Sequence, residues 1–555
     1  MASTGDGMRA NGLKGAHVGL TFHNPVAFWG GTAALTIGVL LHLPEFFRAS
    51  DTQYQLAGMP VSGSMILGMV LIVGGVLSAG YGLFPRKTGA SGAAPTPSFH
   101  LKAMDDAQLS PAHFGLLFVL GVALIIDVMK PATLGFIVPG MREEYGLSNL
   151  QVAIFPVSAL TGTVIGSLFW GILSDRLGRR AAILLSSIMF VGTSICGFMP
   201  SFGINVFMCL LMGMAAGGML PIVYALMAES VPAAKRGWLV VLHGGMGTVG
   251  GYLAASGLAT LLVPHFTWRI LWLMNLPTGL LMLVLNRWIP ESPRFLLQRG
   301  LVEQARKVMA RYGVILEMDG RAEVPAPAVS TTKMPYAGMS KLFRRPFLPR
   351  TTTVVLYGLG YGVVNWGFIT FLPTFLEDAG FKGAAGTKLL FYSSLLAVPG
   401  TVLVAYLYGL WSSKRTMITY ACATVVALAG FALLPHEAAA VNRTLLVALV
   451  GILLIASGGV ISMLSPYTAE VYPTYLRGTG SGLAAGSSKL GGVFGPFLAA
   501  ALAGAAGLTL PALVMAMPMG VAAGVLAWKG VETRGRRLED ISEIEQPVPA
   551  AVADR

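Results

Sequence analysis

The sequence predicts an all-α, multi-pass membrane protein made of two six-helix bundles, with two extra transmembrane helices at the N-terminus. Of its 555 residues, 54% are hydrophobic and 11% are charged, whereas soluble domains carry about 25% charged residues. The mean hydropathy is +0.69. Apolar runs of roughly 20 residues, long enough to cross a bilayer, recur along most of the chain, and a repeated motif divides them into two halves.

The repeat places one motif at the same point of each half. The motif that begins at Glu229 recurs at Glu470, and the same shift relates Glu291 to Glu532. Homologous membrane halves are the architecture of many secondary transporters. The repeated residues are Glu229, Pro232, Arg236 and Gly237 in the first half, and Glu470, Pro473, Arg477 and Gly478 in the second.

The apolar runs give the predicted elements in order. Residues 1–111 form an extension with two spans, at about 26–43 and 62–84, and a polar linker. The first bundle is 112–289, with spans at about 114–139, 150–173, 181–199, 204–227, 238–263 and 270–289. A central cytoplasmic loop, 290–349, contains a short helix at about 302–311. The second bundle is 350–530, with spans at about 353–376, 389–410, 416–434, 445–467, 481–502 and 508–529, and 531–555 is a tail.

Lysine and arginine gather in alternate loops, which this succession of spans places on one side of the membrane. We call it the cation-rich side, and the positive-inside rule makes it cytoplasmic. Both termini are predicted to be cytoplasmic, because the number of spans is even, and the chain is expected in the cell (inner) membrane. Outside the central loop, the cations of this side are Arg176, Arg179, Arg180, Lys235, Arg236, Lys414, Arg415, Arg477, Arg534, Arg536 and Arg537.

Other classes of function are disfavoured. The net charge of +13 comes from cations spread over short loops, so we expect no nucleic-acid binding. The three cysteines, Cys196, Cys209 and Cys422, lie in apolar runs without metal-ligand spacing. We find no catalytic triad, metal cluster or phosphate-binding loop. We therefore predict that the protein is not an enzyme and binds neither metal nor cofactor.

The loop between the second and third spans of the first bundle carries a specific motif. It reads Gly-Ile-Leu-Ser-Asp-Arg-Leu-Gly-Arg-Arg from Gly171 to Arg180 and resembles the signature loop of the major facilitator superfamily. The resemblance implies that the loop latches one half against the other in one gating state. A basic turn that only sets orientation is the alternative. The gating candidates here are Gly171, Asp175, Arg176, Gly178, Arg179 and Arg180.

The repeated motif, together with Pro-Glu-Ser-Pro-Arg at 290–294 and Glu-Thr-Arg at 532–534, resembles the sugar-porter and metabolite-symporter branches of that superfamily. The resemblance implies networks of charged groups between cytoplasmic helix ends, which break and reform as the halves rock. A purely structural role would explain the same residues. The gating candidates from this motif are Glu229, Arg236, Glu470 and Arg477.

Three charged residues stand out because they lie well inside predicted spans, away from the ends: Asp127, Lys130 and Lys489. A charge there costs about 2.5–3.5 kcal/mol on insertion scales, so each is a functional candidate. Asp127 and Lys130 are three residues apart and share a helix face. Pro131 follows directly and is expected to break the helix, as at many midplane sites.

The residues around Asp127 resemble the first-helix motif of the aromatic acid:proton symporter family. Asp127, Gly135 and Phe136 match that motif, whereas Lys130 replaces its second acid. The stretch 486–496 resembles the eleventh helix of the same family, whose cation corresponds to Lys489. The resemblance covers about residues 112–540.

Two lysines against one aspartate favour an anionic cargo. Burial favours the protonated form of Asp127 and the neighbouring lysine favours its carboxylate, so Asp127 is the candidate for proton coupling and Lys489 for binding a carboxylate. A buried pair of Asp127 and Lys130 that only shapes the helix is the alternative. Weaker candidates are Asn365, Tyr361 and Tyr224, and His243 is either a proton relay or a packed, hydrogen-bonded side chain.

The predicted function is secondary active transport of a small organic anion, an aromatic or other carboxylic acid, with protons by alternating access. The functional unit is expected to be a monomer in the lipid bilayer. The alternatives are a sugar or other neutral-metabolite:proton symporter, a proton-coupled exporter of drugs or metabolites, and a sensor that does not transport. Buried lysines disfavour a hydrophobic cation as cargo.

Overall fold

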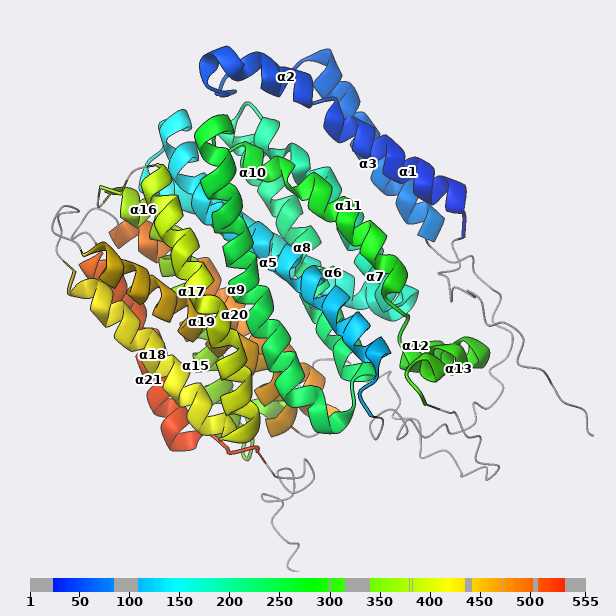
Figure 1. Cartoon of the computed structure of the whole chain (residues 1–555), viewed down its shortest axis with the longest axis vertical. Helices are drawn as coiled ribbons and strands as arrows, with labels where there is room; N and C mark the ends of the chain where they lie inside the picture. Colours follow the sequence, from blue (N-terminus) through cyan, green and yellow to red (C-terminus); the bar gives the residue numbers. More distant parts are fainter. Residues whose placement is uncertain are drawn as a thin grey trace, which may run out of the picture.

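The computed structural model describes residues 23–83, 108–298, 301–314, 340–378, 380–381, 383–434, 442–472, 474–502 and 508–534. These residues form the predicted helical membrane architecture, with two bundles side by side and an N-terminal helical pair against one of them (Figure 1). The fold class predicted from the sequence is confirmed.

The N half contains residues 111–298, and its long helices alternate in direction. It consists of α5 (Pro111–Tyr145), α6 (Asn149–Leu177), α7 (Arg179–Gly192) with η2 (Thr193–Phe198), α8 (Phe202–Ser230), α9 (Ala233–Phe266), the segmented last span α10 (Ile270–Leu273), α11 (Asn275–Leu285) and η3 (Asn286–Trp288), and the short helix α12 (Pro293–Gln298). The predicted helix in the central loop is α13 (Val302–Arg311).

The C half repeats this order after residue 347. Its first span is divided into α15 (Leu348–Val363), the π-helical turn η4 (Val364–Ile369) and α16 (Thr370–Asp378). The remaining helices are α17 (Ala384–Leu410), α18 (Ser413–Ala432), α19 (Arg443–Val471), α20 (Thr474–Leu502) and α21 (Thr509–Lys529).

Thirteen helices in the described residues are long and apolar enough to cross a membrane. One predicted span is not among these thirteen: it is α20, which is 29 residues long but is rich in glycine and serine and carries Lys489. It packs against α15 of its own half and against α6 of the other half. Because α20 lies between the halves, it can be more polar than the other predicted spans.

The expected break at Pro131 does not occur, because α5 continues through Pro131 and Pro139 to Tyr145. A proline in a long membrane helix is tolerated when neighbouring groups compensate for the lost hydrogen bond. Here α5 packs against α8, α9 and α16 along its length. The irregular turn lies instead at η4 in the first span of the C half, and π-turns of this kind are frequent at functional sites.

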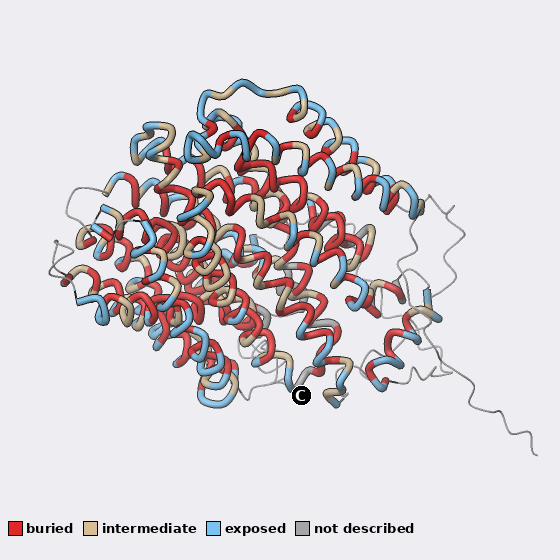
Figure 2. Tube along the Cα trace, turned by 45° about the horizontal axis from the view of Figure 1, so that its top comes forward, coloured by how far each residue is buried: buried red, intermediate tan, exposed pale blue. Residues whose placement is uncertain are grey.

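The N-terminal pair consists of α1 (Pro25–Leu40) and α3 (Gly63–Leu83), which pack closely because glycines face each other. A Cβ on Gly31 would lie 2.6 Å from the carbonyl oxygen of Gly75, and one on Gly38 would lie 2.6 Å from that of Gly68. Both helices contact α7, and the pair lies outside the twelve-span core, where its outer face is exposed (Figures 1 and 2).

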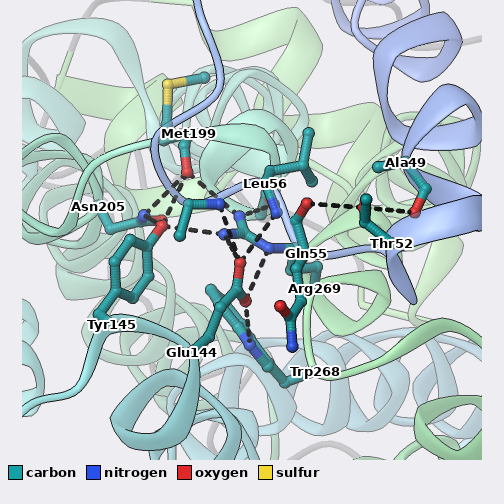
Figure 3. A network of polar contacts seen from close by, with 12 residues as sticks. Ala49, Thr52, Gln55, Leu56, Glu144, Tyr145, Met199, Asn205, Trp268 and Arg269 are labelled. Atoms are coloured by element: carbon teal, nitrogen blue, oxygen red, sulfur yellow. Dashed lines mark hydrogen bonds and ion pairs between the residues drawn. The ribbon is translucent and has the colours of Figure 1, made fainter.

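The connection between α1 and α3 crosses the side of the N half opposite the cation-rich side. It contains α2 (Leu43–Arg48) and η1 (Ala49–Thr52). The backbone N–H groups of Leu56 and Ala57 donate to Glu144 Oε1 at 2.9 and 3.0 Å, as Figure 3 shows for Leu56. The same carboxylate accepts from the Arg269 guanidinium at 2.6 Å and from the Trp268 indole at 3.0 Å. The extension is thus joined to the ends of α5 and α9.

Replacing Glu144 with alanine is expected to destabilise the protein by about 3–5 kcal/mol, because it leaves a buried arginine without its carboxylate. The side chains of Arg269 and Glu144 are 0% and 5% exposed. The matched control is Arg142→Ala, which removes the partly exposed ion pair with Asp378 and is expected to cost no more than about 1 kcal/mol. Unfolding in detergent measures the stability of both variants. Equal losses of stability would contradict the structural role assigned to the buried pair of Glu144 and Arg269.

Candidate functional site

A cavity of about 1350 Å³ lies between the two halves. Helices α5, α6, α8 and α9 of the N half and α15, η4, α19 and α20 of the C half supply its walls. It extends from Asp127 to the cation-rich side, where Arg236, Glu470 and Thr533 line it. A site reached from one side and walled by both halves suits a carrier.

Asp127 lies on the cavity wall and is 4% exposed. Its Oδ1 has no hydrogen-bond partner among the described residues. Val128, Pro131 and Ala132 line the cavity beside it, as expected for one face of a helix with 3.6 residues per turn. A carboxyl group with an unused oxygen in such a place is a candidate for taking up a proton.

Lys489 reaches the same cavity from α20 of the other half. Its ammonium donates to the Ser167 hydroxyl, and to the carbonyl of Thr163 at 3.4 Å. Both acceptors lie on α6 and line the cavity. The structure therefore brings Asp127 and Lys489 together on the wall of one cavity, from opposite halves.

Lys130 does not line the cavity. Its side chain is completely buried and its Nζ lies 2.8 Å from the centre of the Phe190 ring on α7, a cation–π contact. Nζ has no hydrogen-bond partner among the described residues. The shared helix face predicted for Asp127 and Lys130 is thus divided: the aspartate faces the space between the halves and the lysine faces the interior of the N half.

The weaker candidates Asn365, Tyr361 and Tyr224 all line the cavity. Asn365 lies in the π-turn η4, and its carbonyl accepts from the Thr370 hydroxyl at 3.0 Å. His243 does not line it and is packed instead, since its two ring nitrogens lie 2.8 and 3.1 Å from the carbonyl oxygens of Leu239 and Leu117.

Sequence reasoning did not single out Thr163, Ser167 and Tyr252, which also line the cavity. The Tyr252 hydroxyl is buried without a hydrogen-bond partner in the described part of the chain. A serine or threonine in an apolar span usually bonds to the carbonyl four residues earlier, as Ser167 does with Thr163 at 2.7 Å. Only tertiary structure reveals the second use of Ser167.

On the cation-rich side, Glu291 caps the N-terminus of α7. Its carboxylate accepts from the backbone N–H groups of Arg179 and Arg180 at 2.7 and 3.3 Å, where the helix dipole favours a negative charge. Burial raises the pKa of Glu291, and these hydrogen bonds oppose the rise. The Arg180 side chain bonds to Asn286 at 3.0 Å. The side chains of Asp175 and Arg176 lie outside the described ones, so their predicted part in gating stays a prediction.

Gly178 joins α6 to α7 with φ of +100° and ψ of 161°, a conformation open essentially to glycine alone. A Cβ would lie 2.3 Å from Glu291 Oε2. We expect Gly178→Ala to cost about 1–3 kcal/mol in backbone strain, with a further loss because Glu291 is displaced.

The matched control is Gly146→Ala, since Gly146 has φ of +60° but its Cβ would meet open space. Thermal unfolding in detergent should rank Gly178→Ala well below Gly146→Ala. Equal melting temperatures would mean that the contact with Glu291 contributes nothing.

The C half repeats this cap with different residues. Glu532 accepts from the Ser413 N–H at 3.0 Å, the Ser413 hydroxyl at 2.7 Å and the Ser412 hydroxyl, at the start of α18. Burial raises the pKa of Glu532, but these bonds and the Arg534 N–H outweigh it and lower the pKa below its ordinary value. Glu291 and Glu532, which the sequence repeat relates, therefore also have the same structural role in the two halves.

Two other gating candidates, Glu470 and Arg236, line the end of the cavity on the cation-rich side. Glu470 accepts from the hydroxyls of Tyr408 and Thr533 at 2.8 and 2.5 Å, and Arg236 donates to the carbonyl of Val231 at 3.0 Å. The side chains of Glu229 and Arg477 lie outside the described ones, so their predicted part in these networks stays a prediction.

The halves also meet on the opposite side. Arg142 of α5 forms an ion pair with Asp378 of α16 at 3.0 Å. A Cβ on Gly135 would lie 2.5 Å from the carbonyl oxygen of Thr370, so glycine is required where these two helices approach. A vestibule of about 340 Å³ lies here, lined by both halves and by Gln53 and Gln55 of the extension.

A family profile described as "Sugar (and other) transporter" matches residues 112–544. The match therefore covers both halves and begins after the N-terminal extension. Among similar proteins, the niacin transporter NiaP of Acinetobacter baylyi is 24% identical over 444 residues, which cover 79% of this chain and 98% of the relative. The 4-hydroxybenzoate transporter PcaK of the same organism is 29% identical over 415 residues, covering 72% and 87%.

The fold is similar to that of solved transporters. The partially occluded inward open conformation of the xylose transporter XylE from E. coli gives a TM-score of 0.61 at 16% identity, covering 77% of this chain and 100% of XylE. At this identity the similarity establishes the fold alone.

Proposed function

Because the chain belongs to the sugar (and other) transporter family of the major facilitator superfamily, we propose that it carries a small organic anion across the membrane together with protons. The observation that carries the proposal is the placement of Asp127 and Lys489 on the wall of one cavity, from opposite halves. A cation binds a carboxylate through strong, charge-assisted hydrogen bonds, and a buried acid exchanges protons.

The cargo class is a carboxylic acid of modest size. The cavity combines apolar groups such as Leu124 and Trp366 with a few polar ones, the usual composition of a site for a ring with one charged substituent. The names of NiaP and PcaK refer to niacin and 4-hydroxybenzoate, which fit this description. Benzoate and nicotinate are therefore the first probes to use.

The described conformation fits the inward-facing state of an alternating-access cycle. The cavity extends to the cation-rich side, which the positive-inside rule assigns to the cytoplasm of the cell. The ion pair of Arg142 with Asp378 joins the halves on the other side. Since one chain supplies every wall of the cavity, the proposed functional unit is a monomer.

The test is uptake into proteoliposomes under an imposed pH gradient, with labelled benzoate, nicotinate, aliphatic acids, xylose and an organic cation. Accumulation confined to acids, and abolished by a protonophore, is the expected result. Accumulation of xylose would favour the neutral-metabolite symporter, for which Tyr361 and Asn365 offer hydrogen-bonding groups in the cavity. Expulsion of the cation would favour an exporter, and either result would overturn the proposal.

A further inference from the structure

Lys489 links the two halves at the wall of the cavity. Its side chain extends from α20 of the C half, and its ammonium donates to the Ser167 hydroxyl and the Thr163 carbonyl on α6 of the N half. Helices α20 and α6 pack against each other, and all three residues line the cavity. A group expected to bind a cargo carboxylate is thus already bonded to the opposite half.

The acceptor site for this ammonium is held in place by the N half alone. The Ser167 hydroxyl lies 2.7 Å from the carbonyl oxygen of Thr163 and 3.0 Å from that of Gly217 on α8. It can donate its proton to one of these carbonyls while its oxygen accepts from Lys489. A Cβ on Gly217 would lie 2.4 Å from the Thr163 oxygen, so α6 and α8 are in close contact and fix the acceptors.

The two possible partners of Lys489 differ in strength. Ser167 and Thr163 offer neutral oxygens, whereas a carboxylate offers a charged one, and hydrogen bonds between two ionised groups are shorter and stronger. Where the acid lies deeper in the cavity than Ser167, the ammonium must leave α6 to reach it, and the stronger bond favours that move. The bond that joins the halves is then lost as cargo is bound.

We infer that Ser167 is a positioning residue that holds Lys489 in competition with the cargo carboxylate, so that binding an acid releases a tether between the halves. The inference rests on the proposed function, because it assigns the competitor to a carboxylic acid. The tether, the bond from Lys489 to Ser167 and Thr163, lowers the apparent affinity for the acid and favours the conformation in which α6 and α20 are joined.

The test compares Ser167→Ala with Ser158→Ala. Ser158 lies on the same helix and its hydroxyl donates to the carbonyl of Val206 on α8 at 2.8 Å, so it matches the interhelical bond without touching Lys489. In equilibrium binding of labelled benzoate and nicotinate to purified protein, Ser167→Ala is expected to bind about tenfold more tightly than wild type, the size of one hydrogen bond to a charged group. In a Lys489→Ala background the same change is expected to have no effect on binding.

A second readout requires no acid. Spin labels at the exposed positions Leu150 of α6 and Leu445 of α19, in a background that replaces the exposed Cys422, report the distance between the halves. Ser167→Ala is expected to shift the distribution of distances, and Ser158→Ala to leave it as in wild type.

The outcomes separate the inference from the function on which it rests. An unchanged distance distribution in Ser167→Ala, or weaker binding of the acid, would overturn the inference. If wild type transports sugars instead of acids, a carboxylate is not the competitor for Lys489 and the inference fails. A shift in distances would then show only that the bond between Lys489 and Ser167 holds the two halves together.

Discussion

Replacing Lys489 with alanine is expected to reduce benzoate or nicotinate uptake by about 30-fold or more in kcat/KM. Removing one partner of a buried, charged hydrogen bond costs about 2–5 kcal/mol, and each 1.4 kcal/mol corresponds to a factor of about ten. Lys489 lies on the cavity wall with Asp127, and its bonds to Ser167 and Thr163 show that its ammonium extends from α20 to α6. Initial rates in proteoliposomes under a fixed pH gradient measure the loss.

The control for Lys489→Ala is Lys529→Ala, at the exposed end of α21, which removes the same charge away from the cavity. Wild-type uptake is expected in this control. Lys489→Arg keeps a cation but changes its shape, and it should retain part of the activity if charge is what the cargo recognises. Wild-type kinetics in Lys489→Ala, with normal folding, would remove Lys489 from the site and leave it a purely structural tether.

The fold was predictable because membrane helices are selected for length and apolarity, and both can be read from the chain. The short helix Val302–Arg311 in the central loop and the equivalence of Glu291 and Glu532 were also visible, since helical periodicity and the repeat need no tertiary information. The continuous course of α5 through Pro131 was not. Whether a proline breaks a membrane helix depends on the helices that pack around it, which sequence spacing does not describe.

In the candidate site, too, the direction in which each side chain points could not be predicted from sequence spacing. Residues three apart on a helix are about 60° apart around its axis, which follows from 3.6 residues per turn. The edge of the cavity falls between Asp127 and Lys130, so one faces the space between halves and the other faces Phe190. Ser167 was overlooked for a related reason, because its bond to Thr163 is ordinary and its bond to Lys489 joins residues from different halves.

Changing Asp127 to asparagine is expected to separate transport from its driving force. Asparagine has nearly the same shape but neither gains nor loses a proton in the physiological range. The variant should still exchange labelled for unlabelled acid across the membrane, at a rate that does not depend on pH. It should not accumulate the acid against its concentration gradient, so the inside and outside concentrations become equal under an imposed pH gradient.

The control is Asp51→Asn, an exposed acid of the N-terminal extension, which should accumulate the acid as wild type does. Two measurements on the same vesicles, counterflow and gradient-driven uptake, are both needed, because loss of both would indicate a damaged cavity and loss of uptake alone indicates uncoupling. If Asp127→Asn still accumulates the acid, the proton is carried by another group. Lys130 would then be the next candidate, since it is buried on the same helix and its Nζ has no hydrogen-bond partner in the described residues.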